Sequence, residues 1–435
     1  MSEANNEHPF GRATTPRRVL IAGGGIGGLT AALCLHAAGH DVTVFESVRE
    51  PRELGVGINV QPHSVRILHE LGLGPALDEV AIHTRRLSFY SEDGTQIWTE
   101  DRGTHAGLPW PQYSIHRGRF QMVLLEAARE RLGADRVLTG HHLSAFEQDA
   151  SGVTGHFVDK ETGAAAGSYS GDVLVGADGI NSVVRSTLNP DQGPPHYSGL
   201  MLWRGAVEAE PFGDGESMFM AGHDTLKVVA YPIGGAERRA GRSLINWVAE
   251  FPVELDIESA DWNRIAEHDD FAPAFKDWVW DWIDIPSIFA ATETVWEFPM
   301  SDRDPIDRWS HGRVTLLGDA AHVMRPNGSN GSSQAIIDGE SLTAALNVED
   351  DVVDALERYQ DERLPPTRQL TLDNRQTGPE RVLQWVKDRC DGNCVGHHVC
   401  VPRHELETVA NAYKMLAGMS NDQLLAKIDE AGAAN

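Results

Sequence analysis

Three short apolar runs along the chain have the pattern of buried strands. They are Arg18–Ala22, Asp172–Gly176 and Arg313–Leu317. An uninterrupted apolar run that ends in turn residues is typical of a strand covered on both faces. Helical apolar spacing follows the first run, so the order of elements predicts an α/β fold that contains a Rossmann-like domain.

A glycine-rich turn joins the first strand to the helix after it. The turn contains Gly23, Gly25, Ile26, Gly27 and Gly28, with the spacing G-x-G-x-x-G. Leu29–Ala38 continues as a helix, and Asp41–Phe45 predicts a second strand that ends at Glu46. Such glycines let a pyrophosphate approach the start of a helix, and an acid after the second strand can accept hydrogen bonds from a ribose. The motif predicts dinucleotide binding but does not separate NAD from FAD.

The second and third apolar runs each lead to an aspartate. Asp178 follows the second run together with Gly179, where an Asp-Gly turn is the simplest interpretation. Asp319 follows the third run, at a strand end that is well placed for a ribityl chain. The loop after it contains Pro326, Gly328, Gly331, Ser332 and Ser333 and leads into a helix from about 334 to 346. Backbone N–H groups at that helix start would stabilise the negative charge of a reduced flavin. Three motifs in this order predict a chain that returns to FAD three times.

Residues 196–299 are rich in tryptophan and alternate between apolar and polar positions. This alternation predicts a half-buried sheet, which we assign together with residues 76–110 to a substrate-binding domain. The candidates for a pocket wall are Trp203, Tyr231 and Trp247, with weaker support for Arg204 and His223. Ordinary sheet core is the alternative for each aromatic residue. The other expected parts are a disordered leader (1–16), an FAD-binding domain (17–75, 111–195 and 300–365) and a helical C-terminal extension (366–435).

Composition narrows the range of partners. The chain has 435 residues, of which 64 are acidic and 37 basic, and the formal net charge of −27 argues against nucleic acid and against an anionic membrane surface. No apolar run reaches membrane-spanning length, and the polar N-terminus is unlike a secretory signal. Because only four cysteines occur, we expect a cytoplasmic protein without a disulfide framework. We expect a monomer or a homodimer.

Two local patterns point weakly to other chemistry. Cysteines and histidines gather between Cys390 and Cys400, but the Cys-x3-Cys spacing is not that of a zinc knuckle, so we expect no metal site. The string Trp280–Pro286 is one residue longer than the tryptophan motif of flavin halogenases. Halogenases also need an early active-site lysine, and the first lysine here is Lys160, so we reject that activity.

The motifs as written resemble the group A FAD-dependent aromatic hydroxylases, the family of para-hydroxybenzoate and salicylate hydroxylases. Within that family the chain most resembles the phenazine-type members. The matching stretches are 54–62, 111–125, 172–179, 244–248 and 313–339. The resemblance covers roughly residues 17 to 370 and implies an FAD-binding domain interleaved with a substrate-binding sheet.

The resemblance also implies contacts to FAD by position. The residues concerned are Gly57 in the loop 55–57, Arg117, Val137, Asp178, Asp319 and the loop 326–333. Arg117 corresponds to a ribityl or phosphate contact, Val137 to a backbone contact with the adenine, and Asp319 to the ribityl ligand. Asp178 belongs to a motif tied to both FAD and NAD(P)H, and Pro326 corresponds to the residue on the substrate side of the isoalloxazine.

Two positions depart from the family pattern. Asn330-Gly331 stands where many relatives have Gln-Gly, and Arg325 stands where an apolar or aromatic residue is frequent. An arginine beside the flavin could hold a substrate carboxylate through two parallel hydrogen bonds. A solvated surface arginine is the alternative.

The activity that the resemblance implies is hydroxylation of an aromatic or heteroaromatic compound. The reaction would use NADH or NADPH and O2 and proceed through a flavin C4a-hydroperoxide. The phenazine and salicylate members suggest a carboxylate on the substrate, with or without decarboxylation. The alternatives are a hydroxylase of a polyketide or antibiotic-like substrate without decarboxylation, and a flavin-binding scaffold without turnover.

Overall fold

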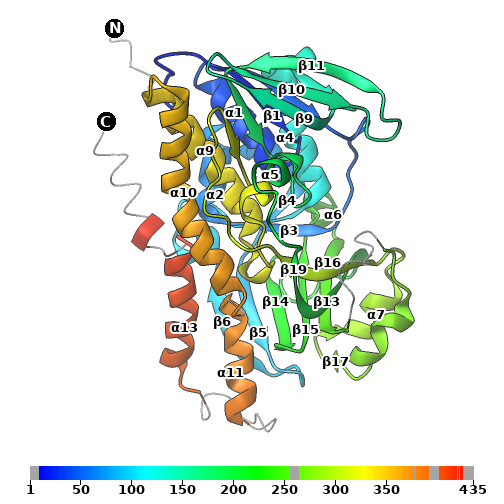
Figure 1. The fold of residues 1–435 in the computed structure, drawn as a ribbon. Coiled ribbons are helices and arrows are strands. Elements are labelled where there is room, and N and C mark those ends of the chain that lie inside the picture. Colours follow the sequence, from blue (N-terminus) through cyan, green and yellow to red (C-terminus); the bar gives the residue numbers. More distant parts are fainter. Residues whose placement is uncertain are drawn as a thin grey trace.

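The computed structural model describes residues 9–254, 264–376, 378–390, 401–418, 420 and 422–424. In Figure 1 the upper part holds a parallel sheet with helices, and the lower part holds a larger sheet with two helices beside it. None of the described helices combines the length and the apolar character needed to cross a membrane.

A five-stranded parallel sheet forms the centre of the upper part, in the order β20-β12-β1-β2-β8. Its strands are β1 (Arg18–Ala22), β2 (Asp41–Glu46), β8 (Val137–Thr139), β12 (Val173–Gly176) and β20 (Val314–Leu316). The three apolar runs of the sequence are neighbours in this sheet, because Val19 pairs with Val173 and Leu174 pairs with Val314. The three motifs therefore begin side by side at the C-terminal ends of the strands, where open α/β sheets bind ligands.

Helices pack against this sheet and against one another. The longer ones are α1 (Ile26–Ala37), α4 (Arg117–Leu132), α9 (Gly331–Val348) and α10 (Val352–Asn374), and the shorter ones are α2 (Pro62–Glu70), α3 (Gly74–Val80), α5 (Val183–Leu188) and α8 (Asp319–His322). Helix α1 packs on α4 and α9. Both α1 and α9 begin a few residues before the apolar spacing that predicted them, because their glycine-containing first turns are already helical.

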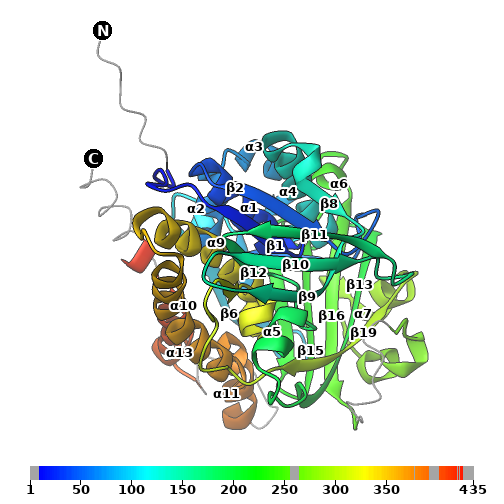
Figure 2. The ribbon, with the colours of Figure 1, turned by 45° about the horizontal axis from the view of Figure 1, so that its top comes forward.

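Two small antiparallel sheets complete the upper part. One contains β9 (His142–Gln148), β10 (Val153–Val158) and β11 (Ala165–Gly171), which cross the front of the molecule in Figure 2. The other contains β3 (Gly57–Val60), β7 (Tyr113–His116) and β4 (Ala81–His83). Strand β3 follows the loop 55–57, for which we expect a contact with FAD. It faces the lower sheet, since the backbone N–H of Gly57 donates to Asn246 Oδ1 at 2.6 Å.

The lower part is built on a seven-stranded sheet in the order β19-β13-β16-β15-β14-β5-β6. Its strands are β5 (Arg86–Tyr90), β6 (Gln96–Asp101), β13 (His196–Ala209), β14 (Met218–His223), β15 (Leu226–Pro232), β16 (Ser243–Pro252) and β19 (Trp296–Asp302). The alternating pattern predicted most of the long strands. It did not reveal β14, because every residue of that strand is buried and the strand therefore lacks alternation.

Short elements cover the face of the lower sheet that is turned away from the upper part. They are β17 (Val279–Trp280), β18 (Ile283–Asp284) and α7 (Ile285–Ala290), whereas α6 (Gly235–Arg239) packs on α3. The string that resembles a halogenase motif forms the β17–β18 hairpin and the start of α7. Its partly buried tryptophans stack against the core, since the rings of Trp280 and Trp282 lie 5.3 Å apart.

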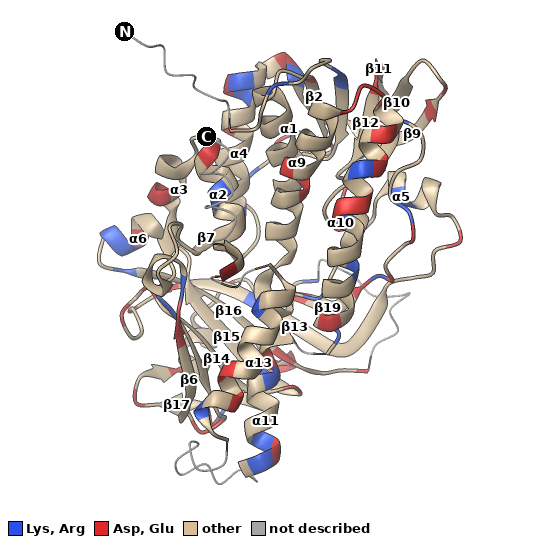
Figure 3. Ribbon diagram, turned by 90° about the vertical axis from the view of Figure 1, so that its left-hand side faces the viewer, with Lys and Arg blue, Asp and Glu red and all other residues tan. Residues whose placement is uncertain are grey.

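The C-terminal extension lies along the lower sheet. It contains η7 (Gly378–Glu380), α11 (Arg381–Cys390) and α13 (Arg403–Leu416), and Figure 1 shows both helices beside β5 and β6. Ion pairs fasten it, since Lys387 pairs with Glu92 and Lys414 pairs with Glu100. Figure 3 shows both basic and acidic residues along α10 and α11.

The expected boundary at residue 365 falls inside α10. Proline lacks a backbone N–H and usually ends a helix, yet Pro365 and Pro366 lie within α10, which continues to Asn374. Tertiary contacts hold the helix on both sides of the prolines: Arg363 pairs with Asp338 before them, and Asn374 Nδ2 donates to the carbonyl oxygen of Arg325 at 3.2 Å after them. The division of the chain into domains stays a proposal, and helix α10 extends across the boundary that we expect at residue 365.

The buried carboxylate of Asp338 joins three segments beneath the Asp319 turn. It accepts hydrogen bonds from the backbone N–H of Gly318 at 3.0 Å, from His322 Nε2 at 2.6 Å and from Arg363 Nε at 2.7 Å. Burial by itself would raise the pKa of Asp338, but His322 and Arg363 outweigh it and lower that pKa to about 2. The loop after β20, helix α9 and helix α10 therefore depend on one ionised group.

We expect Asp338→Asn to destabilise the fold by roughly 3–5 kcal/mol at neutral pH, because the buried Arg363 would lose its charged partner. The folded-state pKa of Asp338 lies below the usual aspartate value of 3.8, so this stability is present above that value and is lost as pH falls toward about 2. Urea unfolding at a series of pH values should show the gap between wild type and variant shrinking across that window. Asp307→Asn, at an exposed ion pair, is the control; equal losses in the two variants would contradict the assignment.

Candidate active site

Among the described residues, two cavities share Arg117 in their walls. The first, of about 380 Å³, lies at the C-terminal ends of β1, β2 and β12, and we call it the strand-end cavity. The second, of about 280 Å³, lies between the lower sheet and the loops after β20, and we call it the sheet cavity. The arginine at the start of α4 thus stands where a long ligand would pass from one cavity to the other.

Glycine is required at the turn that opens the strand-end cavity. Gly23 has φ +118°, and a Cβ there would lie 2.2 Å from the carbonyl oxygen of Ala177. A Cβ at Gly28 would lie 2.1 Å from the carbonyl oxygen of Gly23. Gly25 faces open space, whereas a Cβ at Gly27 would meet Leu317. Gly25 therefore leaves room for a ligand, and Gly27 serves the packing of α1.

Glu46 lies in the wall of the strand-end cavity and is held by backbone groups. Its Oε2 accepts a hydrogen bond from the N–H of Gly24 at 2.9 Å, and its Oε1 accepts one from the N–H of Val48 at 2.7 Å. The side chain is buried. Glu46 is thus fixed where a ribose hydroxyl could donate to it, as the motif suggested.

Asp178 and Asp319 lie in different cavities and have different surroundings. The Asp178 carboxylate accepts hydrogen bonds from the Ser182 hydroxyl and from the N–H of Val183, so it caps the start of α5. Burial raises the pKa of Asp178. Asp319 begins α8 and lines the sheet cavity, and within the described part of the chain no group donates a hydrogen bond to its carboxylate. Asp319 is therefore the acid that is available to a ligand.

The loop 326–333 forms the wall of the sheet cavity that faces the lower sheet. Its cavity-lining members are Pro326, Asn327, Ser329, Asn330, Gly331 and Ser332. Gly328 instead packs against α13, where a Cβ would lie 2.1 Å from the hydroxyl oxygen of Tyr413. Ser333 is buried, and its hydroxyl accepts a hydrogen bond from the N–H of Gln61 at 3.0 Å. The loop leads into α9, a helix of 18 residues whose positive end opens into the cavity.

The facing wall of the sheet cavity consists of alternate residues on four strands. They are Leu202, Arg204, Met220, Lys227, Val229, Tyr231, Val248 and Glu250. Trp203 and Trp247 point to the opposite face: Trp203 donates to Glu297 at 3.0 Å, and Trp247 donates to Thr292 at 2.8 Å. Both tryptophans therefore belong to the core, since successive side chains of a strand alternate between faces. Of the three aromatic pocket candidates, Tyr231 lines the cavity.

Arg204 and Tyr231 both hold the loop 55–57, and both do so through the carbonyl oxygen of Gly57. Each donates a hydrogen bond of 2.9 Å to the carbonyl oxygen of Gly57. The Arg204 Nε atom is buried and has no hydrogen-bond partner in the described structure. Burial lowers the pKa of Arg204, and the nearby Arg117 lowers it further. Burial also raises the pKa of Tyr231 to about 12. A half-buried cation with no carboxylate partner among the described residues thus faces the cavity.

Arg325 does not occupy the role that its sequence position suggested. It lines the sheet cavity, but its Nε donates to Asp302 at 3.0 Å and its Nη1 donates to the carbonyl oxygen of Arg375 at 3.4 Å. Asp302 is fully buried and also pairs with Arg375 at 2.6 Å. Arg325 is therefore neither a solvated surface arginine nor an unpaired one, because a buried carboxylate from β19 already holds it.

Other candidates lie away from both cavities. Val137 is buried in β8, and the segment 141–143 lines the strand-end cavity instead. His223 pairs with Glu92 at 2.7 Å, and burial lowers its pKa. The cysteine and histidine cluster falls mostly on 391–400, outside the described residues, although Cys390 is buried.

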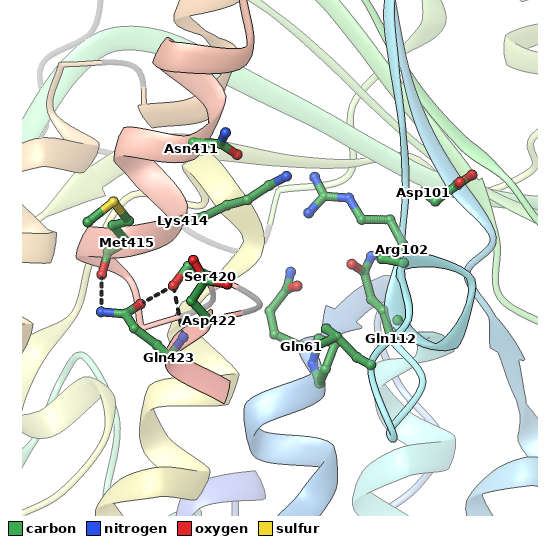
Figure 4. Close-up of a pocket in the computed structure, with 14 residues that line it drawn as sticks. Gln61, Asp101, Arg102, Gln112, Asn411, Lys414, Met415, Ser420, Asp422 and Gln423 are labelled. Atoms are coloured by element: carbon green, nitrogen blue, oxygen red, sulfur yellow. Dashed lines mark hydrogen bonds between the residues drawn. The ribbon is translucent and has the colours of Figure 1, made fainter. Parts of the chain in front are cut away.

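A third cavity, of about 470 Å³, lies between α13 and the chain around Arg102 and Gln112 (Figure 4), and we call it the outer cavity. A narrow gap of about 20 Å³, lined by Asn59, Arg102 and Lys414, lies between the outer cavity and the sheet cavity. Arg102 and Lys414 both pair with Glu100, so charged side chains fill this gap.

The two joined cavities fit the two halves of FAD. The strand-end cavity offers the glycine turn and Glu46 to an ADP moiety, and the sheet cavity offers Asp319 and the start of α9 to a ribityl chain and a flavin. Open space at Gly25 and the unpaired carboxylate of Asp319 are the features that a bound dinucleotide would use.

Comparison with known proteins places the chain among flavoproteins. A family model described as FAD binding domain matches residues 17–373. A phenazine 1,6-dicarboxylic acid hydroxylase of Lysobacter antibioticus is 46% identical over 365 residues, which cover 83% of this chain and 90% of that protein. The 3-hydroxybenzoate 6-hydroxylase of Polaromonas naphthalenivorans is 31% identical over 377 residues, which cover 85% and 89%.

Solved structures share the fold. Klebsiella pneumoniae HpxO complexed with FAD and uric acid superposes with a TM-score of 0.69 at 24% identity, over 94% of this chain and 95% of that one. A salicylate hydroxylase substrate complex superposes with a TM-score of 0.70 at 24% identity, over 93% and 98%. These likenesses show that the arrangement of the upper and lower sheets is a shared architecture.

We expect Asp319→Ala to weaken FAD binding more than Asp178→Ala does. Loss of a charged hydrogen-bond acceptor costs roughly 1.5–3 kcal/mol, which corresponds to about tenfold or more in affinity. The Asp178 carboxylate is already occupied in capping α5, so its removal should lower thermal stability more than FAD affinity. Flavin fluorescence titration of the apoproteins measures both affinities, and wild-type affinity in Asp319→Ala would refute the assignment.

Proposed function

Because the chain belongs to the FAD-binding family of aromatic hydroxylases, we propose that it hydroxylates a ring compound that carries a carboxylate, with NADH or NADPH and O2 as co-substrates. The prediction of this family and of FAD from the three motifs is confirmed, and the chain is an FAD-dependent aromatic monooxygenase. The carboxylate, the nicotinamide and the site residues are the parts that we propose.

The observation that carries the proposal is the half-buried arginine of the sheet cavity, whose Nε atom is fully buried. Arg204 lies on β13 with its Nε unpartnered, and no carboxylate of the described residues lies within ion-pair distance of it. Desolvating a guanidinium is costly unless an anion or hydrogen-bond acceptor compensates it. A substrate carboxylate would supply that compensation through charge-assisted hydrogen bonds. In a chain of net charge −27, this local cation gives an anionic ligand a place to bind.

The relatives support an aromatic acid as the substrate. The names of the Lysobacter and Polaromonas proteins specify phenazine-1,6-dicarboxylic acid and 3-hydroxybenzoate, both of which carry carboxylates. We carry only that chemical class over to this chain. Where oxygen enters the ring carbon that bears the carboxylate, CO2 would leave; entry at another carbon would retain it, and product analysis distinguishes the two.

The residues of the chain position and shield the reaction, while bound FAD would supply reduction by NAD(P)H and transfer of oxygen from O2. Asp319 would hold the ribityl chain, and the positive end of α9 would stabilise negative charge on the flavin. Pro326 would stand between the flavin and the substrate. Arg204 and Tyr231 fix the Gly57 loop, so the substrate face and the flavin face of the cavity are tied together. The lower sheet would shield one side of the bound ring from water.

The activity itself is tested by ligand-stimulated turnover. An enzyme of this kind should consume NADH or NADPH and O2 faster in the presence of an aromatic acid, and should release a hydroxylated product. A flavin-binding scaffold would bind FAD without such stimulation. A polyketide hydroxylase would be stimulated by a neutral polycyclic ligand and not by aromatic acids.

We expect Arg204→Met to weaken the binding of 3-hydroxybenzoate and of phenazine-1-carboxylate, both of which carry a single carboxylate, by about tenfold or more, because charge-assisted hydrogen bonds contribute roughly 1.5–3 kcal/mol. Tyr231 still holds Gly57 in this variant, so FAD affinity should change little. Calorimetric titration of the FAD-loaded protein measures the affinities. Arg325→Met should have the smaller effect, since Asp302 already pairs with Arg325, and Arg358→Met at an exposed ion pair is the control. The proposal fails if Arg204→Met binds both acids as wild type does.

A further inference from the structure

A cluster of three charged side chains forms one end of the sheet cavity. Lys227 on β15 lies directly opposite Glu250 on β16, and its Nζ lies 2.6 Å from Glu250 Oε1. Glu380 of η7 pairs with the same ammonium group. The side chains of Lys227, Glu250 and Glu380 are 4%, 6% and 6% exposed, and all three line the cavity.

The cluster carries more negative than positive charge. Lys227 is the only cation of the described residues within ion-pair distance of either carboxylate, so two carboxylates share one ammonium. The amide of Asn327 donates to Glu380 Oε2 at 2.9 Å and adds no charge. The nearby Asp224 is an acid and so contributes no positive charge. Burial raises the pKa of Asp224, and the negative charge of Glu250 raises it further. A buried excess carboxylate is costly unless a donor reaches it.

A purely structural role, in which the ion pairs only attach η7 to the lower sheet, would not require two carboxylates around one ammonium group. One carboxylate opposite Lys227 would neutralise the ammonium and hold the two strands, and Glu250 already does so. Glu380 makes the site anionic, and it does so inside the cavity where the ring of a substrate would lie. The second carboxylate therefore calls for a ligand that can donate a hydrogen bond.

The strand register places this anionic end at a defined distance from Arg204. Glu250 and Lys227 form one cross-strand pair, and Val248 and Val229 form the next pair on the same face. Arg204 lies opposite Val248 in that second row. Neighbouring rows on one face are two residues apart, about 7 Å along the strand. An aromatic ring resting on the two valines would thus have the arginine at one side and the carboxylates at the other.

We propose that Glu250 and Glu380, held by Lys227, form the acceptor end of the substrate site: they bind a ring O–H or N–H across from the substrate carboxylate and reject a second anionic group. The inference rests on the proposed function, since it takes Arg204 as the place of the carboxylate. It assigns part of the substrate specificity to η7, which follows the end of the family match at residue 373.

The experiment compares three ligands that differ only across the ring from their carboxylate. They are 4-hydroxybenzoate, 4-methoxybenzoate and benzene-1,4-dicarboxylate. Calorimetric titration of the full-length, FAD-loaded protein should give the hydroxyl compound an affinity about tenfold or more above the other two, because a charged acceptor strengthens the hydrogen bond and repels the second carboxylate.

Two variants and a control locate the effect. Glu380→Gln and Glu250→Gln keep the shape of the side chain and remove one negative charge each. Both should bring the preference for the hydroxyl compound down to a few-fold and should improve binding of the dicarboxylate. Glu357→Gln, at an exposed ion pair with Arg308, should leave the ranking of the three ligands unchanged.

Several outcomes would overturn the inference. Equal wild-type affinities for the hydroxyl and methoxy compounds would do so, as would an unchanged ranking in both glutamine variants. A loss of thermal stability in Glu380→Gln without a change in ranking would assign the cluster to tethering alone. Failure of the proposed function has a different signature: none of the three acids binds, or Arg204→Met binds all three as wild type does, and either result removes the inference together with its premise.

Discussion

The placement of the flavin-side residues depends on one buried ionised carboxylate. Asp338 of α9 binds the N–H of Gly318, His322 of α8 and Arg363 of α10 at once. Because the turn after β20 is fixed to α9 through this group, Asp319 and the start of α9 hold a constant position relative to the ends of the strands. A neutral side chain at this position could not compensate the charge of the Arg363 guanidinium, since the low dielectric of the interior makes an unpaired buried charge expensive.

A second constraint joins the two sheets across the ligand space. Gly57 donates through its N–H to Asn246 and accepts through its carbonyl oxygen from both Arg204 and Tyr231. A Cβ at this glycine would lie 2.6 Å from Ile233, so only glycine lets β3 approach the lower sheet this closely. The same contacts point Arg204 into the cavity. The backbone of Gly57 thus fixes the lower sheet relative to the loop 55–57, and a ring bound between them would keep a constant position relative to the cofactor.

Local charge decides what the cavity can accept, because the overall charge of the molecule repels anions. Arg204 and Arg117 bring positive charge to the centre, Arg325 is neutralised by Asp302, and Glu380 brings negative charge to the far end. The C-terminal extension contributes to this balance. It supplies Glu380 through η7, and Tyr413 of α13 packs against Gly328 of the flavin loop.

Sequence alone determined the features that are local. The G-x-G-x-x-G turn, the strands at Arg18–Ala22 and Asp172–Gly176 and the acids after them follow from short-range sterics and apolar runs, and they sufficed to predict the fold class and a dinucleotide such as FAD. The family came from the resemblance of longer stretches to known hydroxylases. Tertiary structure decided the rest. It placed Trp203 and Trp247 in the core, paired Arg325 with Asp302, and carried α10 through Pro365 and Pro366. It also brought Lys227 and Glu250 together with Glu380, from a segment about 130 residues further along the chain. Pairings of this kind depend on strand register and on helix docking, and no local pattern of residues encodes them.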